Sequence, residues 1–164
     1  MRTGNQETFR GQTALITGAS SGIGAATARL FASHGIKVIL VARRVDRLEA
    51  LAAEIIASGG EALVLPADLS EPGGRKTLAS YADQTDILIN NAGFGWYGYF
   101  SDMPEKLVDE MLQVNLIAVA ELTRMFLPSM RQRKNGHIIN ISSVVGGLPE
   151  QGVALYASTK AFMD

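Results

Sequence analysis

The chain has 164 residues, a length typical of one domain, and its 15 Lys and Arg against 16 Asp and Glu residues give a net charge of −1. This balance excludes the broad positive field with which proteins gather nucleic acid or an anionic membrane. A composition of 47% hydrophobic and 19% charged residues excludes the disordered class, and the absence of cysteine excludes a disulfide framework, a catalytic thiol and sulfur-ligated zinc.

Short apolar runs between turn-forming residues recur along the chain. They predict buried strands at residues 13–17, 37–42, 62–65, 87–90 and 137–141. Helical periodicity between these runs predicts helices at residues 23–34, 45–58, 72–83 and 105–131. Strands that alternate with helices pair in parallel through right-handed crossovers. The pattern therefore predicts an α/β fold, a doubly wound parallel sheet or Rossmann fold, in a single domain.

The first ten residues are polar and differ in character from the rest of the chain. We expect residues 1–10 to form a flexible leader and residues 11–164 to form one nucleotide-binding domain. Residues 1–10 hold no apolar stretch of the kind a secretory signal needs, and no apolar run approaches the ~20 residues that cross a bilayer. We therefore expect a cytoplasmic protein with no membrane partner, no nucleic-acid partner and no metal.

A glycine-rich segment, Thr17-Gly18-Ala19-Ser20-Ser21-Gly22-Ile23-Gly24, joins the first predicted strand to the first helix. In this context Gly18 permits a tight turn, Gly22 lets backbone N–H groups approach a phosphate, and Gly24 allows close helix packing. The helix N-terminus adds a positive dipole. A Walker loop is disfavoured because its Gly-Lys-Ser/Thr ending is missing. The segment predicts a pyrophosphate site that includes Ser20, Ser21 and Ile23, and the alternative is a glycine-rich turn without a ligand.

The second predicted strand ends in Arg43-Arg44, where NAD-binding sheets commonly carry an acidic residue for the ribose 2′-hydroxyl. Two guanidinium groups suit a 2′-phosphate instead. We therefore expect NADP(H) rather than NAD(H) as the cofactor. The alternative is a solvated basic pair on the surface.

The chain also carries Tyr156 and Lys160, whose spacing places both on one face of a helix, and Ser143 after the last predicted strand. A neighbouring ammonium favours the phenolate of a tyrosine, so Tyr156 is a candidate proton donor and acceptor. Ser143 could hydrogen-bond a substrate oxygen. Taken alone, a tyrosine four residues before a lysine is also typical of an ordinary surface pair.

Four motifs in order resemble the classical short-chain dehydrogenase/reductase family, and the resemblance covers nearly the whole chain from Gly11 onward. They are the glycine motif, Asp68-Leu69 after the third strand, Asn90-Asn91-Ala92-Gly93 after the fourth, and Ser143 with Tyr156 and Lys160, while Asn115 matches within Val114-Asn115-Leu116. The resemblance implies an oxidoreductase that moves a hydride between NADP(H) and an alcohol or carbonyl carbon. It also implies a homodimer or homotetramer.

The resemblance further implies a role for each matched residue. Asp68 would contact the adenine, with Leu69 also in the cofactor site, and Asn90 with the following Asn91, Ala92 and Gly93 would support the sheet and the cofactor. In catalysis, Lys160 would bind the nicotinamide ribose and lower the pKa of Tyr156, Ser143 would polarise the substrate oxygen, and Asn115 would hold a relay water. From the residues alone, Asp68 and Asn91 also suit turns, and Asn115 could bond to its own backbone.

The family continues with two more strands and a substrate-selecting loop beyond the position of Asp164, so the resemblance implies a member truncated at its C-terminal side. Other readings are a nucleotide-binding or oligomerising fragment without catalysis, or an isomerase or dehydratase on the same fold. The aromatic residues between the fourth strand and the long helix could either line a substrate cleft or pack on that helix. They are Phe94, Trp96, Tyr97, Tyr99 and Phe100.

Overall fold

A parallel sheet of five strands forms the centre of the computed structural model, which describes residues 9–148 and 150–164. The strands are β1 (Thr13–Thr17), β2 (Lys37–Ala42), β3 (Ala62–Pro66), β4 (Ile87–Asn90) and β5 (His137–Asn140). Their order across the sheet is β3-β2-β1-β4-β5, and every neighbouring pair is parallel. This arrangement confirms the predicted doubly wound α/β fold.

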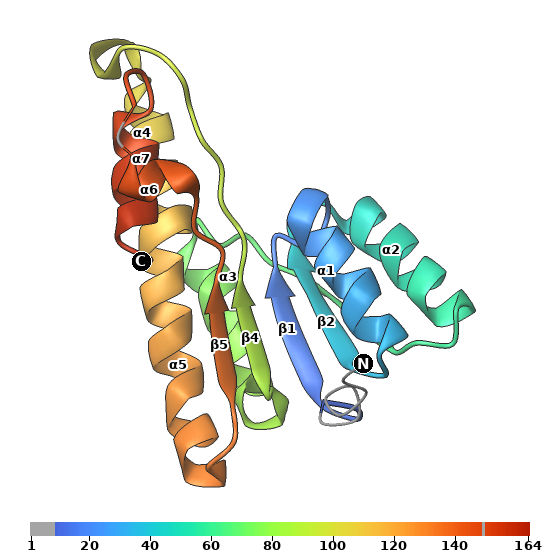
Figure 1. Ribbon diagram of the computed structural model, residues 1–164. Helices are drawn as coiled ribbons and strands as arrows, with labels where there is room; N and C mark the ends of the chain where they lie inside the picture. The colour runs from blue at the N-terminus through green and yellow to red at the C-terminus, as the bar shows by residue number, and fades with distance from the viewer. Residues whose placement is uncertain (1–8, 149) are drawn as a thin grey trace, which may run out of the picture.

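Helices cover both faces of the sheet (Figure 1). Helices α1 (Gly22–Ser33) and α2 (Val45–Ala57) lie on one face, over β1 and β2. The opposite face carries the short helix α3 (Pro72–Lys76), the 3₁₀ helix η1 (Thr77–Gln84) and α5 (Ala118–Arg133). Because the chain winds outward from β1 in both directions, the strand order reverses between β1 and β4.

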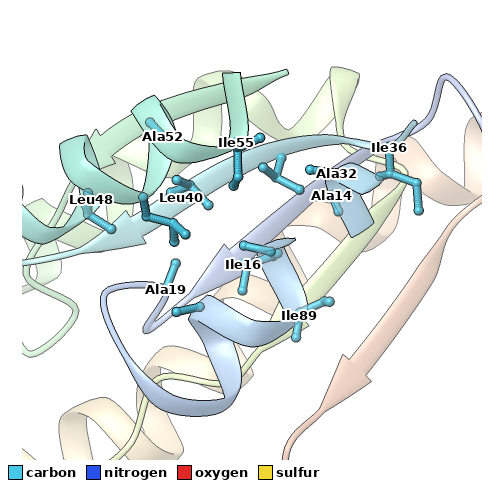
Figure 2. Packing of buried hydrophobic residues seen from close by; sticks show 14 of the residues in the cluster. Ala14, Ile16, Ala19, Ala32, Ile36, Leu40, Leu48, Ala52, Ile55 and Ile89 are labelled. Carbon is cyan, nitrogen blue, oxygen red and sulfur yellow. The ribbon is translucent and has the colours of Figure 1, made fainter. Parts of the chain in front are cut away.

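Each central strand supplies side chains to two separate cores. Ala14 and Ile16 of β1 belong to the cluster under α1 and α2, whereas Leu15 between them belongs to the cluster under α5. Figure 2 shows the first cluster, in which Leu48 and Ile55 of α2 pack over the sheet. This alternation follows from the two-residue period of a strand, and it explains why β1 is apolar at successive positions.

The predicted helix at residues 105–131 is divided into three parts. They are α4 (Glu105–Leu112), a π-helical turn η3 (Gln113–Ile117) and α5. The predicted helix at 72–83 likewise changes type after Lys76, where η1 begins, and its first turn contains two glycines, which are poor helix formers. Both differences concern the type of helix within one predicted segment, so the predicted order of helices and strands is unchanged.

Three further helices lie in the C-terminal half of the chain. Tyr156 and Lys160 both lie on α7 (Ala154–Ala161), as their spacing predicts. The sequence does not reveal η2 (Phe100–Asp102) or α6 (Val144–Gly147), because helices of three or four residues carry no periodic pattern.

The predicted leader falls mostly on residues 1–8, which lie outside the described residues. Its last part is described, and the ring of Phe9 lies edge-on to the ring of His137 with centroids 5.4 Å apart. Within the described ranges, no helix combines the length and the apolar character that a membrane span requires.

Helix α5 offers a matched test of this packing. Leu122 of α5 lies in the core and is 1% exposed, whereas Leu127 of the same helix is 41% exposed. We expect Leu122→Ala to lower the free energy of unfolding by about 2–5 kcal/mol, because it removes buried methyl groups and leaves a cavity. Leu127→Ala should cost less than about 1 kcal/mol. Urea denaturation of the two variants measures both values, and equal losses would contradict the described packing.

Candidate active site

A cleft opens where the strand order reverses. At its base lies a set of hydrogen bonds between the carboxyl ends of β1 and β4, which we call the clamp. The hydroxyl of Thr17, which is 1% exposed, donates to the Ile89 carbonyl at 3.1 Å and accepts from the backbone N–H groups of Asn91 and Ala92 at 2.9 and 3.0 Å. The side-chain amide of Asn91 donates to the Thr17 carbonyl at 2.8 Å. These bonds hold together the carboxyl ends of the two strands, which is where open α/β sheets bind ligands.

The glycine motif forms the turn between β1 and α1. Gly18 and Gly22 have φ angles of 67° and 54°, a region that other residues rarely adopt. A Cβ at Gly18 would lie 2.8 Å from the Cα of Ala92, and one at Gly24 would lie 2.5 Å from both the Asn91 amide nitrogen and the Gly18 carbonyl oxygen. Gly24 therefore brings α1 close to the clamp. The space around Gly22 is open, which leaves room for a ligand at the helix N-terminus.

The two arginines that follow β2 contact two other loops. The guanidinium of Arg44 donates to the hydroxyls of Ser20 and Ser21 at 2.8 and 2.7 Å. Nη1 of Arg43 lies 3.8 Å from Oδ2 of Asp68. Positive charge and hydroxyl groups therefore gather beside the glycine turn.

Asp68 is the acidic group of this cleft. Its partial burial would raise the pKa of the carboxyl, but hydrogen bonds from the Ser70 hydroxyl and backbone, together with the Arg43 guanidinium, outweigh that effect and place the pKa below its usual range. Asp68 is therefore ionised at neutral pH and partly offsets the charge of the arginines.

The cleft has a volume of about 610 Å³, within the range of small-molecule and cofactor sites. Except for Gly24, all of the residues predicted to bind the cofactor line it. They are Gly18, Ser20, Ser21, Gly22, Ile23, Arg43, Arg44, Asp68, Leu69, Asn91, Ala92, Gly93, Tyr156 and Lys160. Segments from both halves of the chain thus meet in one cavity.

Tyr156 and Lys160 lie at the end of the cleft formed by α7 and β5. Nζ of Lys160 is 5.7 Å from the centroid of the Tyr156 ring and donates to the Ile141 carbonyl at 2.7 Å. Lys160 is 4% exposed, and this burial lowers the pKa of its ammonium, while the charge of Asp164 opposes the shift. A buried cation therefore sits beside the phenol.

Asn115 and Ser143 are not among the lining residues of the cleft. Asn115 is fully buried in the π-helical turn, where its side chain accepts from Phe94 N–H at 3.1 Å and donates to the Phe94 carbonyl at 2.9 Å and to the Thr159 hydroxyl at 3.1 Å. It thereby ties the loop after β4 to α7. Ser143 is the N-cap of α6, and its hydroxyl accepts from Val145 N–H at 3.5 Å.

The sequence assigns no role to five of the residues that line the cleft. They are Ala42, Ala67, Val114, Ile141 and Ser142. All five lie at a predicted strand end or directly adjoin a motif residue, so the only available signal was that adjacency. Among residues 9–148 and 150–164, no group of three or more His, Asp or Glu residues could hold a metal ion.

Both roles considered for the aromatic segment occur in it. Phe94 lines the cleft, whereas Trp96 and Phe100 lie with Met103 and Met111 around a small cavity against α4. Tyr97 is 75% exposed, and a Cβ at Gly152 would lie 2.9 Å from its ring.

Comparison with known proteins identifies similar chains of greater length. The chain is 44% identical to a short chain dehydrogenase of Pseudocercospora fijiensis and 37% identical to a very-long-chain 3-oxoacyl-CoA reductase of Anas platyrhynchos. These matches cover 95% and 94% of this chain and 52% of each relative. The chain thus spans about half the length of these relatives.

Solved structures agree with this relationship. A short-chain dehydrogenase from Sphingobium yanoikuyae in complex with NADPH superposes with a TM-score of 0.89 at 41% identity, covering 92% of this chain and 60% of that one. A metagenomic short-chain oxidoreductase in complex with NADP has the same TM-score at 43% identity, with 94% and 72% covered. The sequence model of the short chain dehydrogenases matches residues 12–164. With that match over most of its length, the chain belongs to the short chain dehydrogenase family.

Proposed function

We propose that this protein is an NADP(H)-dependent oxidoreductase that moves a hydride between the cofactor and an alcohol or carbonyl carbon. The observation that carries the proposal is that one cleft contains the glycine turn, Arg43 and Arg44, and the pair Tyr156 and Lys160. Relatives solved in complex with NADP or NADPH support the choice of cofactor. When bound, the nicotinamide would supply the carbon that gives or accepts the hydride.

The residues of the cleft suit a phosphorylated dinucleotide. The N-terminus of α1 offers backbone N–H groups and a positive dipole for the pyrophosphate, and the open space at Gly22 leaves that end accessible. Arg44, held by the two serine hydroxyls, and Arg43 offer planar donors for a 2′-phosphate. No acidic residue ends β2, so no carboxylate there repels the phosphate.

At the other end of the cleft, Tyr156 gives a proton to the substrate oxygen in reduction and takes it in oxidation. In this proposal the ammonium of Lys160, with Nζ 5.7 Å from the centre of the Tyr156 ring, offsets the negative charge that develops on the phenol oxygen as the proton leaves. Lys160 also has N–H donors for the nicotinamide ribose. In this proposal the hydroxyl of Ser143, next to Ser142 in the wall of the cleft, hydrogen-bonds the substrate oxygen. The side chain of Asn115 is engaged by Phe94 and Thr159, so Asn115 contributes by holding the loop after β4 to α7 rather than by binding a relay water with its side chain.

The substrate in this proposal is a small-molecule alcohol or carbonyl compound. The relatives include a very-long-chain 3-oxoacyl-CoA reductase and a bulky-bulky ketone specific alcohol dehydrogenase, so the family accepts carbonyl groups in different surroundings. Assembly as a homodimer or homotetramer and a cytoplasmic location stay predictions.

The first test of the proposal concerns the cofactor. We expect Arg43→Ala/Arg44→Ala to weaken NADPH binding at least about tenfold, because hydrogen bonds to a charged group contribute about 1.5–3 kcal/mol each. NADH lacks the 2′-phosphate, and its binding should change far less. Fluorescence titration of the full chain with each nucleotide measures both constants, and an equal loss for NADPH and NADH would remove the arginines from the 2′-phosphate site.

The second test concerns proton transfer. Tyr156→Phe removes the phenol hydroxyl and keeps the ring, so NADPH binding should be retained while the reduction rate falls by a factor of about 10²–10⁴, the usual contribution of a general acid. Single-turnover oxidation of NADPH by carbonyl substrates measures the rate, and Tyr97→Phe, a change on an exposed ring, serves as the control. A Tyr156→Phe variant that turns over at the unchanged rate would exclude the proton role.

A further inference from the structure

A buried arginine outside every sequence motif contacts the loop that follows β3. Arg75, in α3, is 2% exposed. Its Nε donates to Oε2 of Glu121 on α5 at 2.7 Å, and its Nη1 donates to the carbonyls of Leu69 and Ser70 at 2.8 and 3.2 Å. A salt bridge that only joined α3 to α5 would need the contact with Glu121 alone. The two carbonyl contacts show that the guanidinium also holds the loop.

This loop continues directly into the cofactor cleft. Asp68 and Leu69 both line the cleft. Leu69 carries one of the carbonyl groups that Arg75 binds, and Asp68 directly precedes it. The backbone N–H and hydroxyl of Ser70 donate to Oδ1 of Asp68 at 2.9 and 2.7 Å. With Oδ1 engaged in this way, Oδ2 is the oxygen that faces Arg43 at 3.8 Å. The orientation of Asp68 toward Arg43 therefore depends on the position of Ser70.

The start of α3 packs tightly against the same loop. A Cβ at Gly74 would overlap the main chain of Asp68, and the backbone N–H of Glu71 donates to the Asp68 carbonyl at 3.3 Å. Helix α3 itself has five residues, two of them glycine, so it has little intrinsic stability. Its anchorage comes from tertiary contacts, of which Arg75 makes the charged ones.

From these contacts we infer that Arg75 is a positioning residue for the adenosine 2′-phosphate end of the cleft, acting through Leu69, Ser70 and Asp68. The inference rests on the proposed function. Arg75 does not touch the cleft, since it is absent from the lining residues. Its guanidinium fixes two carbonyl groups, these fix Ser70, and Ser70 orients the carboxylate that faces Arg43. Glu121 neutralises the buried cation and joins this chain of contacts to α5.

Fragments of the cofactor test the inference, because they separate the two ends of the cleft. Adenosine 2′,5′-bisphosphate occupies only the adenosine end, and reduced nicotinamide mononucleotide occupies only the other end. In Arg75→Met, the affinity of the full chain for the bisphosphate and for NADPH should fall by the same factor of about ten, the loss expected when buried carbonyls lose their donors. The affinity for the mononucleotide should stay unchanged. Isothermal calorimetry measures all three.

Arg133 provides the matched control. Its guanidinium also donates to two backbone carbonyls, those of Asp83 and Thr85 at the end of η1, at 2.6 and 2.7 Å, but this segment precedes β4 and lies at the opposite end of the strand from the cleft. Arg133→Met should lower the melting temperature and leave all three affinities unchanged. If Arg75→Met does not fold, Arg75→Lys keeps the charge with fewer donors and is expected to change the affinities in the same direction.

Two results would overturn the inference while leaving the proposed function intact. One is an Arg75 variant that binds the bisphosphate as tightly as the wild type does, and the other is an equal loss of affinity for the bisphosphate and the mononucleotide. A wild-type chain that binds neither NADPH nor the bisphosphate would overturn the proposed function, and the inference with it.

Discussion

The hydroxyl of Thr17 is the interaction on which the cleft depends. It is buried at the end of β1 and bonds to three backbone groups, the Ile89 carbonyl in β4 and the N–H groups of Asn91 and Ala92 directly after it. A buried hydroxyl without partners would be costly, so these three bonds favour the arrangement in which the ends of β1 and β4 lie together. They hold β4 beside β1 at the level where the chain turns into the glycine motif. Gly18, Asn91 and Ala92, which follow the two strands, line the cleft at this point.

Local charge in this cavity is independent of the charge of the whole chain. The net charge is −1, yet Arg43, Arg44, Lys160 and the N-terminus of α1 all face one cleft. Only Asp68 opposes them among the acidic side chains that line it. Because the Debye length is about 8 Å at physiological ionic strength, a ligand in the cleft is influenced mainly by these few groups. A near-neutral composition is therefore compatible with a local site that attracts a phosphorylated cofactor.

Sequence predicted the parts of the structure that depend on local pattern. The strands were placed within one residue at each end, because buried parallel strands form continuous apolar runs between turn residues. The positions of the motif residues followed from the rule that ligands bind at strand carboxyl ends. The π-helical turn at Asn115, the partners of Arg44 and the burial of Arg75 were not predicted. Each of these features involves contacts with residues more than 20 positions away in the sequence. Periodicity and spacing carry no information about such contacts.

The helical rod of α4, η3 and α5 connects the two ends of the cleft. From its π-helical turn, Asn115 holds Phe94 and Thr159, next to the tyrosine and lysine of α7. From α5, Glu121 holds Arg75 and through it the loop of Asp68. These two anchoring residues lie on one continuous element whose buried face packs on the sheet. Because Asn115 and Glu121 belong to one helical element, the same element is tied to α7 at the proton-transfer end of the cleft and to the loop of Asp68 at the adenosine end.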